Sequence, residues 1–110
     1  MAEGKILMVD DDKEIADLVE IHLKGEGYQV YKAYNGKEAL EIFDAEEIDL
    51  AILDIMMPGM DGMSFAKKIK SDKLLSRIPL ILLSALNNID EQTRGIESGA
   101  EAYITKPFNV

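Results

Sequence analysis

Apolar residues gather in five short runs along the chain, each about as long as a β-strand. The runs occupy residues 5–9, 28–31, 50–53, 79–83 and 102–105. Three of them contain the stretches ILMV, LAIL and LILL, in which every position is apolar. Because such strands have no polar face to turn toward water, this pattern predicts a parallel sheet that is covered by helices on both sides.

Between these runs lie stretches whose apolar residues recur at helical spacing. They predict helices over residues 12–25, 37–46 and 62–72, and a weaker one over 89–98. The apolar face of the first helix is predicted to carry Ile15, Leu18, Val19, His22 and Leu23. His22 is the chain's only histidine, and this position predicts a structural role for it. The alternation of strand and helix predicts an α/β fold, a doubly wound five-stranded parallel sheet.

Composition and charge narrow the range of functions. The 110 residues are long enough for a single domain, 1–110, and carry a net charge of −9. That charge disfavours direct contact with nucleic acid or with an anionic membrane. The chain has no cysteine, which excludes disulfide and thiolate chemistry. No long apolar segment precedes the first charged residues, so we expect neither a signal peptide nor a membrane span, and a cytoplasmic location.

Polar side chains stand where the predicted strands end. The first strand is followed by three acids and the third by one, while a serine and a lysine follow the fourth and fifth: Asp10, Asp11, Asp12, Asp54, Ser84 and Lys106. The carboxyl ends of parallel strands meet at one edge of a sheet, where these residues should converge. Clustered carboxylates need a cation or shared protons at neutral pH, and oxygen ligands alone favour Mg²⁺, Mn²⁺ or Ca²⁺ as the ion. A carboxylate, such a metal, a lysine and a hydroxyl group together suit phosphoryl transfer to aspartate.

Four segments carry these residues: ILMVDDD (6–12), LAILDIMMPGMDG (50–62), ILLSA (81–85) and YITKPF (103–108). In this order and spacing they resemble the receiver domain of two-component response regulators, over essentially the whole chain. The resemblance implies a flavodoxin-like strand order, 2-1-3-4-5. It also implies that Asp54 is the phosphoacceptor, which takes a phosphoryl group from a sensor histidine kinase or phosphotransfer protein in a Mg²⁺-dependent reaction, with Mn²⁺ as a possible substitute.

The resemblance assigns the metal ligands and the residues that control phosphoryl lifetime. Asp10 and Asp11 look like the family's acidic metal-binding pair, which acts together with Asp54 and the backbone carbonyl of Met56. Met56 and Leu86 occupy the two positions that tune hydrolysis in the family. Neither side chain can orient an attacking water, so we expect a comparatively long-lived phosphoryl group.

Three further residues match the family's switch. Lys106 resembles the lysine that pairs with the phosphoryl group, and Ser84 stands at the position of the switch hydroxyl. Tyr103 matches the aromatic residue that turns inward when this hydroxyl moves. The resemblance implies that the face built from the fourth helix and fifth strand then changes and controls an output domain or a downstream protein. Such a module is regulated by phosphorylation and is not otherwise an enzyme.

Other functions fit the acidic segment less well. Asp10-x-Asp12 also resembles the nucleophile motif of haloacid-dehalogenase-type phosphatases, but Glu14 stands where that motif usually has Thr or Val, and the chain has no cap domain. An EF-hand loop is rejected because Ile15 replaces the glycine that such a loop requires. We expect Asp12 to cap the first helix. A receiver-like module that only mediates contacts is disfavoured by the complete set of site residues.

The predicted fold lacks a closing fifth helix after the last strand, because the sequence stops at Val110. We therefore expect an apolar strip of the sheet to be uncovered. This predicts either a shortened fragment or an assembly, a homodimer or a strand-swapped form.

Overall fold

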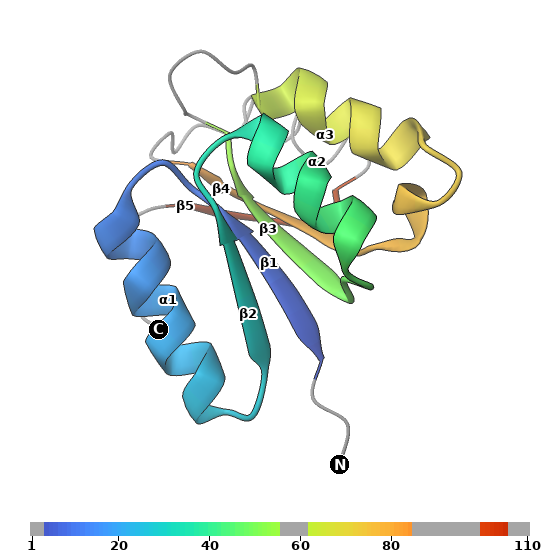
Figure 1. Ribbon diagram of the computed structural model, residues 1–110. Helices are drawn as coiled ribbons and strands as arrows, with labels where there is room; N and C mark the ends of the chain where they lie inside the picture. Colours follow the sequence, from blue (N-terminus) through green and yellow to red (C-terminus); the bar gives the residue numbers. More distant parts are fainter. Residues whose placement is uncertain (1–3, 56–61, 85–99, 106–110) are drawn as a thin grey trace.

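A computed structural model describes residues 4–55, 62–84 and 100–105 and has the predicted α/β architecture (Figure 1). All strand pairs of its five-stranded sheet are parallel, and the strand order is 2-1-3-4-5, as expected. The strands are β1 (Lys5–Val9), β2 (Gln29–Ala33), β3 (Leu50–Asp54), β4 (Leu80–Ser84) and β5 (Ala102–Thr105). The helices are α1 (Lys13–Gly25), α2 (Gly36–Ala45), α3 (Gly62–Ser71) and a short 3₁₀ helix, η1 (Leu75–Arg77). The helix predicted over 89–98 lies outside the described residues.

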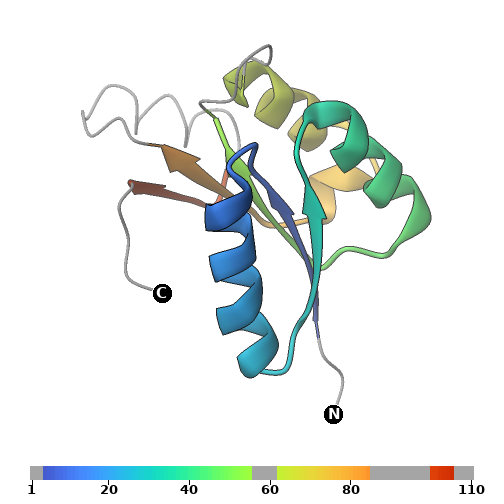
Figure 2. The ribbon, with the colours of Figure 1, turned by 60° about the vertical axis from the view of Figure 1, so that its left-hand side comes forward.

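Helices lie on both faces of the sheet, α1 on one and α2 with α3 on the other (Figures 1 and 2). Successive side chains of β1 point alternately to the two faces of the sheet. Leu7 and Val9 belong to the core under α2 and α3, whereas Met8 packs with Ala16 and Val19 of α1. None of the three β1 side chains is more than 1% exposed. The uninterrupted apolar run therefore reflects burial on both sides. In the described part of the chain no helix is long and apolar enough to cross a membrane.

Side-chain caps fix where α1 and α2 begin. The Asp12 carboxylate accepts a hydrogen bond from the Glu14 N–H at the start of α1, which confirms the predicted cap. At the start of α2, Asn35 accepts from the Glu38 N–H, and the Glu38 carboxylate accepts from the Tyr34 N–H. This reciprocal pair satisfies two backbone donors at once. Asp12 comes three residues after β1 and Asn35 two residues after β2, so both caps lie where the chain turns from the carboxyl edge of the sheet into a helix.

The second strand begins one residue later and ends two residues later than the sequence predicted, at Gln29–Ala33 instead of 28–31. The prediction stopped before Lys32 because a lysine interrupts the apolar run. In the fold, Lys32 Nζ lies 2.7 Å from an oxygen of Asp17 and 2.9 Å from one of Glu20, both on α1. These hydrogen bonds, first that to Asp17, hold the pKa of Lys32 above its ordinary value. The strand continues through Lys32 because α1 supplies its counter-charges.

The predicted apolar face of α1 is partly wrong. His22 is exposed instead of packed in the core, and Leu18 is 46% exposed. The residues that face the sheet are centred on Ala16 and Val19, which are at most 5% exposed. Ile15 and Leu23, which were also predicted on this face, pack against the same core. Leu18 and His22 lie to the side of this buried stripe and face the solvent.

The uncovered apolar strip expected on the sheet stays a prediction. Ile104 of β5 is 40% exposed, whereas Leu83, its partner in the register with β4, is 3% exposed. An assembly formed through this strip stays a prediction.

A network of polar side chains ties the amino ends of β4 and β5 to the segment after α3. The Glu101 carboxylate accepts a hydrogen bond of 2.7 Å from the Leu80 N–H, and Lys70 Nζ lies 3.1 Å from the same carboxylate. Lys70 also donates to the backbone carbonyls of Ser76 and Ile78. Partial burial opposes ionisation of Glu101, but the bonds from Leu80 and Lys70 outweigh it and lower its pKa.

We expect the stabilisation from Glu101 to disappear in acid. A lowered carboxyl pKa stabilises the fold above the ordinary value of 4.5, and this contribution is lost as the pH falls through the folded-state pKa. Glu101→Gln should therefore be less stable than the wild type at neutral pH, and the difference should shrink in acid. Urea unfolding at a series of pH values measures it, with Glu41→Gln, an exposed change on α2, as the control. A difference that stays constant with pH would contradict this role of the charge.

Candidate functional site

Strand pairing brings two acids from distant parts of the sequence to one edge of the sheet. In the register of β1 with β3, Val9 lies opposite Leu53. Asp10 and Asp54 are the next residues of their strands, so both stand at the carboxyl edge. The Asp10 N–H donates to the carbonyl of Ala33, which anchors this acid to β2 as well. The position of the pair is therefore fixed by the backbone of three neighbouring strands.

Three carboxylates meet at this edge. One oxygen from each of Asp10, Asp11 and Asp54 lies within 4.8 Å of the other two. Asp10 is completely buried and Asp54 is 3% exposed, whereas Asp11 is exposed. We call these three residues the acidic pocket. Buried like charges at such distances favour a bound cation, and three carboxylates suit a hard ion such as Mg²⁺, Mn²⁺ or Ca²⁺. The donor set thus fits the divalent metal predicted from the sequence.

Asp12 lies outside the acidic pocket and orients one member of it. Its side chain caps α1, while its backbone N–H donates to a carboxylate oxygen of Asp10 at 2.9 Å. This hydrogen bond holds Asp10 in a fixed direction at the base of the helix. The three consecutive aspartates therefore have two different roles, as the sequence predicted: Asp10 and Asp11 in the pocket, and Asp12 at the cap.

Comparison with known proteins decides the family. The family model described as the response regulator receiver domain matches residues 6–110. The chain belongs to this family. A receiver domain is a signalling module of two-component systems and not a catalytic enzyme, which sets aside the haloacid-dehalogenase alternative.

The receiver domain has relatives in sequence and in structure. The regulatory protein VanR of Enterococcus faecium is 53% identical over 104 residues, which cover 94% of this chain and 44% of VanR. The chain thus spans less than half of that relative. A response regulator receiver domain from Francisella is 36% identical with a TM-score of 0.89, over 97% of this chain and 87% of the other. A Burkholderia pseudomallei response regulator, solved with a phosphorylated aspartic acid, calcium and citrate, is 26% identical with a TM-score of 0.88, over 98% and 62%.

Two further site residues predicted from the sequence can be placed in this receiver domain. Ser84 is the last residue of β4 and pairs with Thr105; since Asp54 pairs with Leu83, Ser84 lies one residue beyond it at the same edge. Tyr103 is partly buried on β5 and packs against the core under α2 and α3. The remaining predicted residues, Met56, Leu86 and Lys106, lie outside the described residues, as does the side chain of Ser84.

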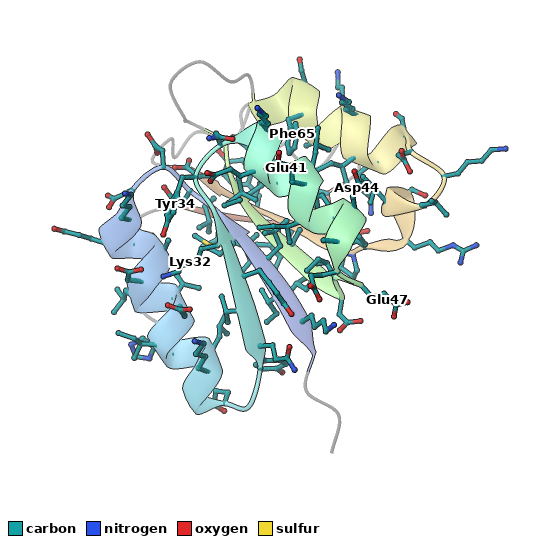
Figure 3. The ribbon with its side chains drawn as sticks, in the orientation of Figure 1. Lys32, Tyr34, Glu41, Asp44, Glu47 and Phe65 are labelled. Atoms are coloured by element: carbon teal, nitrogen blue, oxygen red, sulfur yellow. The ribbon has the colours of Figure 1, made fainter. Side chains whose placement is uncertain are left out.

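One interaction between the first turn of α1 and the residue after β2 was not anticipated. The Lys13 ammonium lies 5.3 Å from the centre of the Tyr34 ring, within range of a cation–π interaction. Tyr34 follows β2 directly and packs with the core under α1 (Figure 3). No functional residue was predicted at the end of the second strand. An aromatic residue one position after that strand was the signal available.

Proposed function

We propose that this receiver domain accepts a phosphoryl group on Asp54 from a phosphohistidine of a sensor histidine kinase or phosphotransfer protein. The observation that carries the proposal is the position of Asp54, which is nearly buried and has two further carboxylates within 4.8 Å. An Asp54 oxygen attacks phosphorus, the bond from phosphorus to the histidine nitrogen breaks, and an acyl phosphate forms. The histidine leaves as a neutral imidazole after it takes up a proton.

A divalent cation, Mg²⁺ with Mn²⁺ as a substitute, would be held by Asp10, Asp11, Asp54 and the backbone carbonyl of Met56. An ion bound there would supply positive charge to offset the charge on the transferring phosphoryl oxygens. Asp10, which is buried and fixed by the Asp12 N–H, presents a preorganised ligand. The phosphorylated aspartate and calcium ion of the Burkholderia pseudomallei structure support the same chemistry here.

Lys106 would pair with the phosphoryl group, and Ser84 would donate a hydrogen bond to it. Movement of the Ser84 hydroxyl would let Tyr103 turn inward and change the face formed by residues 89–98 and β5. The backbone position of Ser84, one residue beyond the partner of Asp54, supports this coupling. Through that face the domain would control an output domain or downstream protein in the cytoplasm, with no direct contact to nucleic acid or membrane. The chain's net charge of −9 favours a protein partner over nucleic acid.

The test is to locate the modification chemically. The domain is incubated with acetyl phosphate and Mg²⁺, and the phosphorylated residue is mapped by mass spectrometry after the acyl phosphate has been trapped. We expect modification at Asp54; modification at Asp10 would contradict the assignment of Asp54 as the phosphoacceptor. After the donor is removed, the decay of the label measures its lifetime. Because Met56 and Leu86 offer no group to orient water, we expect slow decay, and a half-life of only seconds would contradict that expectation.

A further inference from the structure

An open groove lies at the amino edge of the sheet, the edge opposite the acidic pocket. Its volume is about 650 Å³, which is in the range of ordinary binding pockets. Phe43 and Ile48, both at most 9% exposed, form its apolar base. One wall is the segment that joins α2 to β3, and the other is the segment around η1. The remaining lining residues are Glu46, Glu47, Asp49, Leu74, Leu75, Arg77 and Ile78.

An apolar side chain stands at the rim of this groove. Leu74 is 78% exposed, the highest value among the large apolar side chains in the described ranges. It lies on a turn that is held in place by Asp72, whose carboxylate accepts from the Leu74 N–H at 2.8 Å and the Leu75 N–H at 3.0 Å. The same two bonds, first that from Leu75, lower the pKa of Asp72. Leu74 is therefore presented on a fixed backbone, which reduces the entropy lost when it is bound.

The two walls of the groove carry opposite charges. Lys73 precedes Leu74 and is exposed, and so is Arg77. The facing wall carries Glu47 and Asp49, both exposed, and Glu47 projects outward beyond the end of α2 (Figure 3). A lysine–leucine pair thus stands next to a groove with an apolar base and an acidic wall. The same patch of surface therefore holds both an exposed apolar side chain and a groove with an apolar base.

We propose that this groove is a contact between two copies of the chain, in which the Lys73–Leu74 turn of each copy enters the groove of the other. The turn and the groove lie on the same patch of surface. When a second copy is related to the first by a two-fold rotation, each turn can therefore meet the groove of the other copy, which gives a symmetric dimer. Leu74 loses its exposed surface against Phe43 and Ile48 of the other copy. Lys73 lies opposite the acidic wall, near Glu47. The contact is small, so the dimer is weak.

The location of the groove separates this contact from phosphorylation. One wall of the groove immediately precedes β3, and the other, around η1, leads into β4. The groove therefore lies at the amino ends of these strands, while Asp54 lies at the carboxyl end of β3. Association through the groove leaves the acidic pocket open. The proposal therefore stands or fails independently of the phosphoacceptor function, and Asp54→Asn should associate as the wild type does.

Sedimentation equilibrium up to about 1 mM protein tests the contact through a charge exchange. Glu47→Lys alone and Lys73→Glu alone each place like charges opposite one another at both halves of the dimer. We expect each variant to self-associate about tenfold more weakly than the wild type. An equimolar mixture of the two variants restores opposite charges at both halves, so its association should return to the wild-type level. Simple loss of folding cannot produce such rescue, and circular dichroism checks the fold of each variant.

Matched variants place the same charge changes outside the groove. Glu41→Lys on α2 and Lys67→Glu on α3 are exposed positions that do not line it, and they should associate as the wild type does, alone and mixed. Leu74→Ser should weaken association without changing the fold. A wild-type chain that stays monomeric at the highest concentration overturns the proposal, since another molecule then has to be the occupant. Failure of the mixture to recover, or equal effects of the matched variants, overturns it as well.

Discussion

The Asp54→Asn variant is expected to incorporate no phosphoryl group from acetyl phosphate, with residual label below about 1% of the wild-type amount. Asparagine keeps the size of the side chain but its amide is not a nucleophile. The position is 3% exposed and ends a paired strand, so an isosteric change there leaves the backbone in place. Intact-mass measurement of the wild type and the variant after the same incubation gives the result directly.

A neighbouring acid provides the control for this experiment. Asp12→Asn removes the same charge two residues after Asp10, and asparagine caps a helix about as well as aspartate does. Asp12 caps α1 and stands outside the acidic pocket, so its variant should keep at least about half of the wild-type label. Equal loss in both variants would indicate a general electrostatic effect. Loss only in Asp12→Asn would favour a mechanism in which that residue takes part.

The second large effect concerns the metal. Mg²⁺ at about ten times its dissociation constant should stabilise the domain by about 1.4 kcal/mol and raise Tm by about 5 °C. Asp10→Asn should lose most of this increase, because a ligand charge at the centre of the pocket is removed while the acceptor for the Asp12 N–H is retained. Calorimetry with and without Mg²⁺ measures the shift, and isothermal titration measures the affinity, which should fall at least about tenfold.

Glu14→Gln is the matched variant for the metal experiment. Glu14 is an exposed acid in the first turn of α1, close in sequence to Asp10 but not part of the acidic pocket. Its variant should show the same Mg²⁺-dependent shift as the wild type. A shift that survives in Asp10→Asn would mean that the ion is held elsewhere on this acidic chain.

The position of the acidic pocket was predictable from the sequence for a simple reason. Parallel strands end at a common edge, so Asp10 and Asp54 had to meet once their strands were recognised as neighbours. The caps at Asp12 and Asn35 follow from local chemistry, although only the first was predicted. The caps are interactions between residues close together in the sequence, and the meeting of Asp10 with Asp54 follows from the parallel direction of their strands.

Other features depend on contacts that a local pattern does not contain. Helical periodicity placed Leu18 and His22 in the core, but the buried face of α1 is centred on Ala16 and Val19, which leaves Leu18 and His22 exposed. The prediction ended β2 too early because the partners of Lys32 are contributed by a different element. The exposure of Leu74 could not be foreseen either, because an apolar pair such as Leu74–Leu75 does not reveal which member faces water.

In a parallel sheet all strands begin at one edge, the amino edge, and end at the opposite edge, the carboxyl edge. The acidic pocket lies at the carboxyl edge. Each strand has about five residues and therefore separates this edge from the amino edge by roughly 16 Å. Two molecules that associate through their amino edges would expose their two carboxyl edges to solvent on opposite sides of the dimer. Two phosphoryl donor proteins could then bind the dimer at the same time, one at each acidic pocket. Phosphorylation would not require the dimer to dissociate.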